Sequence, residues 1–265
     1  MQHAYFLPLN QRALIWQFAR REVLARYRGS LLGLAWSFLT PLLMLAVYTF
    51  VFRVVFNARW TGGPEGDFEF ALQVYAGLII FTWFAEVVNR APRLVLDQPN
   101  LVTKVVFPLE TLPWVAVLAG LFHLALNLVA LLAAAAIARG GLPASALALP
   151  FALAPLVPLL LGLGWFLAAL GVFVRDIGQL TTLAVSLLMF LSPVFYPTSS
   201  LPARWQPWLA ANPLTPVMEQ VRRVALDGLW PDWPQLALHL AIASAVAWAG
   251  ARWFAATRKG FADVL

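Results

Sequence analysis

Long stretches without a charged side chain dominate the sequence. Residues 29–52, 111–138, 140–174 and 177–203 contain no Asp, Glu, Lys or Arg. A helix needs about 20 consecutive apolar residues to cross the hydrocarbon core of a bilayer, and each stretch is at least that long. The pattern predicts an all-α, polytopic membrane protein that forms one transmembrane domain over residues 1–265. We expect six transmembrane helices, at residues 31–56, 70–88, 111–138, 145–173, 177–196 and 233–254.

The second of these helices has the weakest apolar pattern. Its uncharged run extends only from Phe70 to Ala85. This run is shorter than the roughly 20 residues that a span needs. We therefore expect Glu86 to lie at the membrane boundary, near Asn89 and Arg90.

Two connections are too long to be simple turns. The prolines in residues 89–113 predict several short helical pieces instead of one long helix. Residues 197–232 mix prolines with tryptophans, which favour the headgroup level, so we expect a pair of short helices that dip into the interface. The links near Arg139 and at Arg175 and Asp176 are very short and predict antiparallel neighbouring helices.

A basic segment precedes the first span. Residues 8–29 start with a proline suited to a first helical turn and continue with good helix formers, which predicts an amphipathic interface helix. Two interpretations remain open: the helix anchors the chain at the interface, or it forms an anion site for a lipid-linked substrate. The arginines that would bind a lipid headgroup or another anion there are Arg20, Arg21, Arg26 and Arg28.

Two features of the first span concern helix geometry. Gly29 and Gly33 form a Gly-x-x-x-Gly pair, a spacing that allows close approach of two helices. Pro41 removes a backbone hydrogen bond in the middle of the span and predicts a kink there.

Composition supports a membrane location, and the distribution of charge predicts the orientation of the chain in the membrane. Hydrophobic residues make up 62% of the chain and charged residues only 11%, far from the roughly 25% charged of a soluble domain. Of the 18 Lys and Arg residues, twelve fall on the side of the termini, so the positive-inside rule predicts that both termini are cytoplasmic. The cations lie beside apolar spans, where lipid headgroups are better partners than nucleic acid. The six cations on the other side are Arg53, Arg59, Arg139, Arg204, Arg222 and Arg223.

The sequence lacks the motifs of common catalytic and nucleotide sites. A P-loop requires Gly-Lys-Ser/Thr after a glycine-rich turn, but Lys104 and Lys259, the only lysines, follow Thr103 and Arg258. There is no cysteine, no Gly-x-Ser-x-Gly and no His-Glu-x-x-His. We therefore expect no cofactor and no metal on this chain, and no catalytic residue. If the chain transports, its energy comes from another polypeptide.

Ionisable groups within the spans are few. Ion-coupled transporters usually carry such groups near the midplane, and here they reduce to His123 and His239. Each histidine fits a neutral ring hydrogen-bonded to a neighbouring helix, or a proton relay. Aromatic residues in the first and fifth spans either stack on sugar rings or pack as interface anchors. These aromatics are Trp36, Tyr48, Phe52, Phe190, Phe195 and Tyr196.

Several segments together resemble a known family. They are RREVLARYRGSLLGLAWSFLTPLLMLAVYTFVF, NLVTKVVFPLETLP, FVRDIGQL, SPVFYPTSSLP and NPLTPVMEQVRRVALDG, in this order. In sequence and order they resemble the permease subunits of bacterial polysaccharide ABC exporters, the type-two permeases that export O-antigen and teichoic acid. The resemblance covers essentially the whole chain.

The resemblance implies partners and roles for individual residues. It implies a homodimer in the bacterial inner membrane with two copies of a separate ATPase, which binds ATP and Mg. The N-terminal helix and a short helix in residues 89–113 would dock on that ATPase, and spans one and five would line a sugar conduit. The coupling residues would be Asn100, Leu101, Lys104, Phe107 and Pro108; the cytoplasmic turn would be Arg175 and Asp176; the external gate would include Pro213, Glu219 and Arg222.

The implied activity is export of a lipid-linked, O-antigen-like polysaccharide. A permease for capsule or teichoic acid remains an alternative. A membrane-embedded transferase that acts on a lipid-linked sugar is a second alternative, because it would share the basic interface and the aromatic residues, but the sequence groups no acid, base or metal ligand in one loop.

Overall fold

The chain is all-helical in the part that its computed structural model describes, residues 8–55, 66–103 and 107–264. No strand occurs among these residues, which confirms the predicted fold class at this level. The helices are α2 (Arg12–Tyr27), α3 (Trp36–Thr49), α4 (Asp67–Arg90), α5 (Pro99–Thr103), α6 (Leu112–Arg139), α7 (Leu149–Leu153), α8 (Leu156–Phe173), α9 (Ile177–Leu191), α10 (Gln206–Ala211), α11 (Leu214–Ala225), α12 (Trp233–Thr257) and α13 (Phe261–Val264).

Four helical stretches in the described residues are long and apolar enough to cross a membrane. They are Asp67–Arg93, Leu109–Arg139, Ala144–Phe173 and Trp233–Val264. Two shorter apolar helices, α3 and α9, accompany them. The backbone continues from α3 as a π-helix, Phe50–Val55, which extends this helical segment to Val55.

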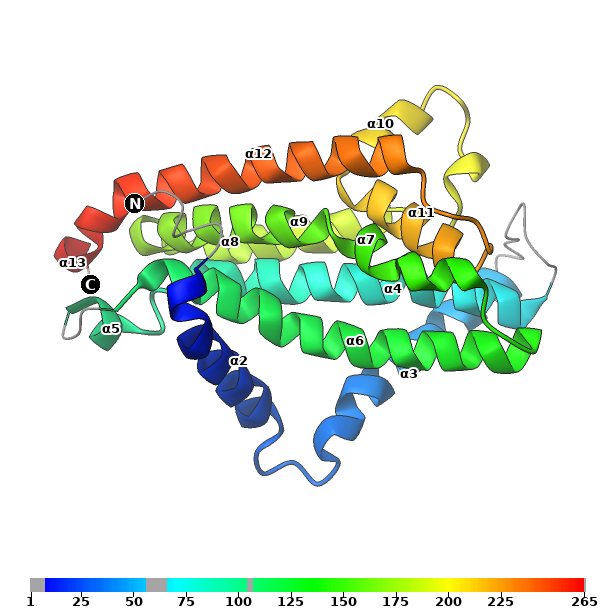
Figure 1. Cartoon of the computed structure of the whole chain (residues 1–265), viewed down its shortest axis with the longest axis horizontal. Coiled ribbons are helices and arrows are strands. Elements are labelled where there is room, and N and C mark those ends of the chain that lie inside the picture. The colour runs from blue at the N-terminus through cyan, green and yellow to red at the C-terminus, as the bar shows by residue number, and fades with distance from the viewer. Residues whose placement is uncertain (1–7, 56–65, 104–106, 265) are drawn as a thin grey trace.

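The long helices lie side by side, with α4 at the centre (Figure 1). Helices α3, α6, α9 and α11 pack against α4, so its apolar side chains are buried on nearly every side. Helices α5 and α13 contact each other at one end of the bundle, and α10 and α11 lie toward the opposite end. We refer to these as the α5 end and the α10 end.

Helices α8 and α12 pack together through two glycines. A Cβ atom built on Gly250 would lie 2.1 Å from the carbonyl oxygen of Gly162, and one on Gly162 would lie 2.6 Å from the carbonyl oxygen of Val246. Only glycine allows backbones to come this close. The contact depends on these two glycines, one in each helix, which the sequence pattern did not indicate.

The Gly-x-x-x-Gly pair before α3 has a different role from the expected one. Gly29 and Gly33 have φ angles of +81° and +51°, and a Cβ on either would meet nothing within 4 Å. These glycines form the turn between α2 and α3, which diverge from the bundle as a V (Figure 1). The expected helix contact at this pair is therefore wrong within this chain, because left-handed backbone is what the turn requires.

Prolines set several helix boundaries. Residues 89–113 form a 3-10 turn at Ala91–Arg93, the short helix α5 and a second 3-10 turn at Leu109–Thr111. Helix α9 ends at Leu191, five residues before the expected end of this span, because Pro193 favours the extended conformation at Ser192 (φ −102°, ψ 149°). Two short helices, α10 and α11, follow in the segment expected to carry a pair.

Candidate functional site

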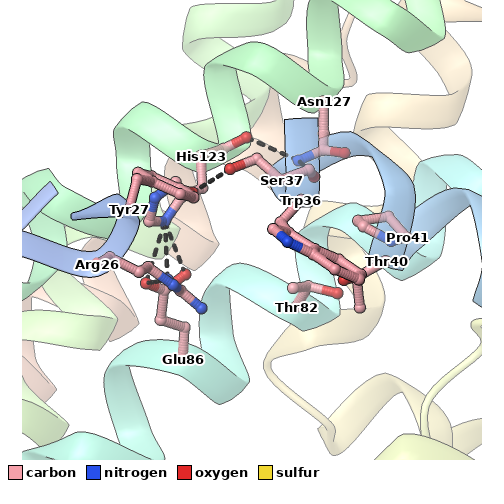
Figure 2. A pocket seen from close by; sticks show the side chains of 10 residues that line it. All are labelled: Arg26, Tyr27, Trp36, Ser37, Thr40, Pro41, Thr82, Glu86, His123 and Asn127. Carbon is pink, nitrogen blue, oxygen red and sulfur yellow. Dashed lines mark hydrogen bonds and ion pairs between the residues drawn. The ribbon is translucent and has the colours of Figure 1, made fainter. Parts of the chain in front are cut away.

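A polar pocket of about 310 Å³ lies between α2, α3, α4 and α6. Figure 2 shows its side chains, which come from segments up to a hundred residues apart in the sequence. Most of the surrounding helix surface is apolar, so a cluster of polar groups here is costly unless it is paired or serves a function. Its lining residues are Arg26, Tyr27, Trp36, Ser37, Thr40, Pro41, Thr82, Glu86, His123 and Asn127.

One end of the pocket is a charged cluster. Arg26 on α2 forms an ion pair with Glu86 on α4, and His123 Nδ1 on α6 lies 3.1 Å from both Glu86 Oε1 and Arg26 Nη1. One turn away on both helices, Glu22 pairs with Arg90. The two pairs fasten α2 to α4 and leave the charged cluster close to electrically neutral.

The opposite wall of the pocket depends on Asn127. Its Nδ2 donates to the carbonyl oxygens of His123 (2.8 Å) and Ser37 (3.2 Å), and its Oδ1 accepts a hydrogen bond from the hydroxyl of Tyr75 (2.8 Å). The hydroxyl of Tyr27 also bonds to that of Ser37. These bonds tie α3 to α2, α4 and α6 and use up both groups of the Asn127 amide.

Three side chains form the open face of the pocket. Trp36 and Thr40 are one helical turn apart on α3, and both are exposed, Trp36 by 45%. Thr82 is the one exposed residue of α4 between Leu72 and Phe84, and its hydroxyl donates to Leu78 O at 2.8 Å. This face therefore offers an aromatic ring and two hydroxyl groups on exposed residues, and Figure 2 shows how they lie.

The arginines predicted to meet a lipid headgroup divide into two groups. Arg20, Arg21 and Arg28 are exposed on α2 or directly after it. Arg26 lines the pocket and is paired with Glu86. Within the described residues, Arg20, Arg21 and Arg28 form no ion pair, so an anion would meet uncompensated positive charge beside the pocket and not inside it.

The predicted coupling residues lie at the α5 end. Asn100 is exposed on α5, whereas Leu101 and Pro108 are half-buried. Phe107 is buried, and the centroid of its ring lies 5.4 Å from the ring centroid of Phe18 on α2. Lys104 lies outside the described residues. At this end too, Arg175 and Asp176 are exposed in the short turn between α8 and α9.

The predicted conduit aromatics occupy two places. Trp36 belongs to the pocket, whereas Tyr48 on α3 contacts Phe195, with ring centroids 4.5 Å apart. Phe190 lies 6.1 Å from Phe195, and the hydroxyl of Tyr196 donates to Phe190 O at 3.1 Å. Phe52 lies in the π-helix after α3, and its side chain is outside the described part of the structure.

Arg222, a residue of the predicted gate segment, is tightly hydrogen-bonded. It is buried, and its guanidinium donates to the carbonyl oxygens of Gln73 (3.0 Å), Pro193 (2.7 Å) and Val194 (2.9 Å). Burial lowers the pKa of Arg222 to about 9, and Glu219 and Asp227 oppose that shift, so the side chain stays cationic at neutral pH.

These contacts join the gate segment to the bundle. Arg222 links α11 to α4 and to the turn that follows α9. Glu219 accepts a hydrogen bond from the hydroxyl of Thr198, and Pro213 immediately precedes α11. A second polar pocket, about 250 Å³ in volume, lies beside Glu219 and Arg222.

Most of the pocket residues were not predicted. The sequence placed Glu86 at a membrane boundary and left His123 with two interpretations, while Ser37, Thr82 and Asn127 were not singled out. The available signal was an ionisable or amide side chain inside an apolar stretch, which often marks a functional site. Nothing in the local pattern shows that these residues meet.

Comparison with known proteins places the chain in a family. The family described as "ABC-2 type transporter" matches residues 13–226. An O-antigen export system permease protein of Myxococcus xanthus is 31% identical over 256 residues, which is 95% of each chain. One of Klebsiella pneumoniae is 22% identical over 211 residues (79% of this chain, 78% of the relative). A polysialic acid transport protein of Escherichia coli is 23% identical over 209 residues (78% and 79%). The chain therefore belongs to the ABC-2 type transporter family, and the prediction of a transporter's membrane subunit is confirmed.

Proposed function

We propose that this chain is the membrane-spanning subunit of an exporter that moves lipid-linked, O-antigen-like polysaccharide out of the cytoplasm across the bacterial inner membrane. The observation that carries the proposal is the similarity to an O-antigen export permease over 95% of both chains. A polar pocket with an exposed tryptophan, set among apolar helices, is consistent with a substrate that has both a lipid and a sugar part.

In this proposal the chain crosses the membrane six times. Helices α3 and α9 are the two further spans: the π-helix lengthens α3, and a turn at residues 192–196 follows α9. Both termini face the cytoplasm, so the α5 end is cytoplasmic and α10 and α11 form short gate helices on the outer side. The excess of Lys and Arg on the side of the termini supports this orientation.

Energy for export is supplied by a separate ATPase. The chain contains no P-loop, so ATP and Mg bind to that partner, two copies of which assemble with two copies of this chain. The ATPase docks at the α5 end, against α5 and the start of α2. The exposed position of Asn100 supports this docking surface, and the contact between Phe107 and Phe18 would pass motion from α5 to α2.

Deletion of the gene tests the exporter function. We expect the deletion strain to lose the surface polysaccharide and to accumulate lipid-linked polymer inside the cell, because synthesis continues without an exit. The measurement is immunoblotting of surface glycan together with quantification of the lipid-linked polymer. Retention of normal surface glycan, in a strain with no second permease gene, would refute the proposal.

A cross-linking experiment tests the docking surface. The chain has no cysteine, so Asn100→Cys introduces a single thiol on α5. With a reagent that joins a thiol to an amine about 10 Å away, we expect one product of permease and ATPase on a denaturing gel. Trp208→Cys, also exposed (73%) but on α10, is the matched control and is expected to give none. Equal yields from the two variants, or none from Asn100→Cys, would contradict docking at α5.

The nature of the glycan has one specific alternative. The similarity to a polysialic acid transport protein favours a capsular polysaccharide as the second candidate. Teichoic acid is the third candidate, and it rests on the sequence resemblance alone. Membership in a transporter family removes the support for a membrane-embedded transferase. Composition analysis of the polymer that accumulates in the deletion strain distinguishes the glycans.

A further inference from the structure

We propose that the pocket between α2, α3, α4 and α6 binds the sugar residue attached directly to the diphosphate of the lipid-linked substrate, with Trp36, Thr40 and Thr82 as its principal contacts. The inference rests on the proposed export of a lipid-linked polysaccharide. It assigns to this pocket a neutral, hydroxyl-rich ligand and makes it a point of substrate selection.

The electrostatics of the pocket favour a neutral ligand over a phosphate. Among the described residues, Arg26 is the one Lys or Arg that lines it, and Glu86 neutralises that charge directly. A phosphate in the pocket would have to compete with Glu86 for the guanidinium and would lie close to a carboxylate of the same sign. Sugar hydroxyls, by contrast, donate to a carboxylate and accept from a guanidinium without breaking the pair.

The open face has the chemistry of a sugar site. The indole of Trp36 presents an apolar surface, on which the C–H face of a pyranose packs. The hydroxyls of Thr40 and Thr82 lie beside it, and Figure 2 shows all three side chains on one side of the pocket. The hydroxyl of Thr40 can donate to a sugar or accept from it, whereas that of Thr82 donates to Leu78 O and is left to accept. The two threonines therefore match neighbouring hydroxyls of a sugar, which both donate and accept.

The position of the pocket indicates which part of the substrate it binds, namely the first sugar of the polymer. Arg28 directly follows Tyr27, which lines the pocket, and is exposed. Arg20 and Arg21, earlier on α2, are exposed as well. A diphosphate held by Arg28 at the headgroup level would put the attached sugar next to the pocket. The volume of about 310 Å³ is at the small end of ligand pockets and suits one sugar ring, not an extended chain.

A binding experiment with two lipid probes tests this assignment. The permease is purified with its partner ATPase in lipid nanodiscs, and the probes are farnesyl diphosphate carrying one glucose and farnesyl diphosphate alone. We expect the wild type to bind the glucose-bearing probe about tenfold more tightly, and Trp36→Ala to bind both probes equally. This is the loss expected when a stacking surface is removed. Trp36→Phe keeps a ring and is expected to retain most of the preference.

The control variants separate the pocket from general effects. Trp248→Ala removes a tryptophan of similar exposure (54%) on α12, outside the pocket, and should keep the tenfold preference. If Trp36→Ala does not yield folded protein, Thr82→Val, which keeps the side-chain shape, carries the test and should lower the preference severalfold. Equal binding of the two probes by the wild type, or an unchanged preference in both pocket variants, would overturn the assignment.

Failure of this inference is distinguishable from failure of the proposed function. If the deletion strain loses its surface glycan while the wild-type permease shows no preference for the glucose-bearing probe, export stands and only the sugar pocket is wrong. If the deletion leaves the surface glycan unchanged, the exporter function itself is wrong, whatever the probes show.

Discussion

Replacing Gly250 with alanine is expected to lower the midpoint of thermal unfolding in detergent by about 5–10 °C and to reduce the amount of permease in the membrane severalfold. The new Cβ would lie 2.1 Å from the carbonyl oxygen of Gly162 and 2.8 Å from its carbonyl carbon. Both atoms belong to the backbone, so no side chain can move aside, and α12 must separate from α8. Thermal unfolding of the purified protein and immunoblotting of membranes measure the two effects.

The matched control for this variant is Gly178→Ala. Gly178 is also helical, near the start of α9, but a Cβ there meets nothing within 4 Å. Alanine has the higher helix propensity, so this change should leave the unfolding midpoint the same or raise it slightly. If the two variants behaved alike, the close backbone contact between α8 and α12 would not be a determinant of stability.

Replacing Arg222 with methionine is the second change with a large expected effect. The side chain of methionine fills much of the same space but leaves the carbonyl oxygens of Pro193 and Val194 without the guanidinium donor, whereas Gln73 O lies inside α4 and keeps its helical hydrogen bond. Because a buried acceptor without a partner costs about 1–3 kcal/mol, we expect a loss of at least about 2 kcal/mol. The free energy of unfolding in a denaturant titration measures this loss.

Two further variants test whether the geometry of the guanidinium matters. Arg222→Lys keeps the charge, but one amine does not reproduce the fixed fork of donors, so it is expected to recover only a small part of the stability. Arg223→Met makes the same change at the next residue, which donates a single exposed bond to Trp230 O (2.7 Å), and should cost less than about 1 kcal/mol. Similar losses from Arg222→Met and Arg223→Met would contradict a special role for Arg222.

The sequence predicted the helical architecture well because its signals are local. A stretch of residues without charge is sufficient to indicate a membrane helix, and prolines in residues 89–113 are sufficient to indicate short pieces. The end of α9 was predicted too late, although Pro193 carries the signal that ends it. The resemblance added the coupling role of Asn100 and the gate role of Arg222, and both stay predictions.

The sequence alone determined less about the candidate site. It identified Arg26 as a cation before the first span and Trp36 as an aromatic residue within it. In the sequence, 60 residues separate Arg26 from its partner Glu86, and a further 37 separate Glu86 from His123. A local pattern carries no information about such distant contacts, so it did not show that Glu86 neutralises Arg26. Nor did it show that Trp36 lines this pocket, whereas Tyr48 and Phe195 contact each other elsewhere.

What the sequence determined by itself is therefore the class of protein: apolar runs specify membrane helices, and the excess of cations on one side predicts their direction. What only the tertiary structure decided is which polar groups meet inside the bundle. Arg26 and Trp36 line one pocket together with residues of α4 and α6, and the close approach of Gly162 and Gly250 joins α8 to α12. The physical reason is that burial of a polar group depends on partners from other helices, whereas insertion of a helix depends mainly on its own residues.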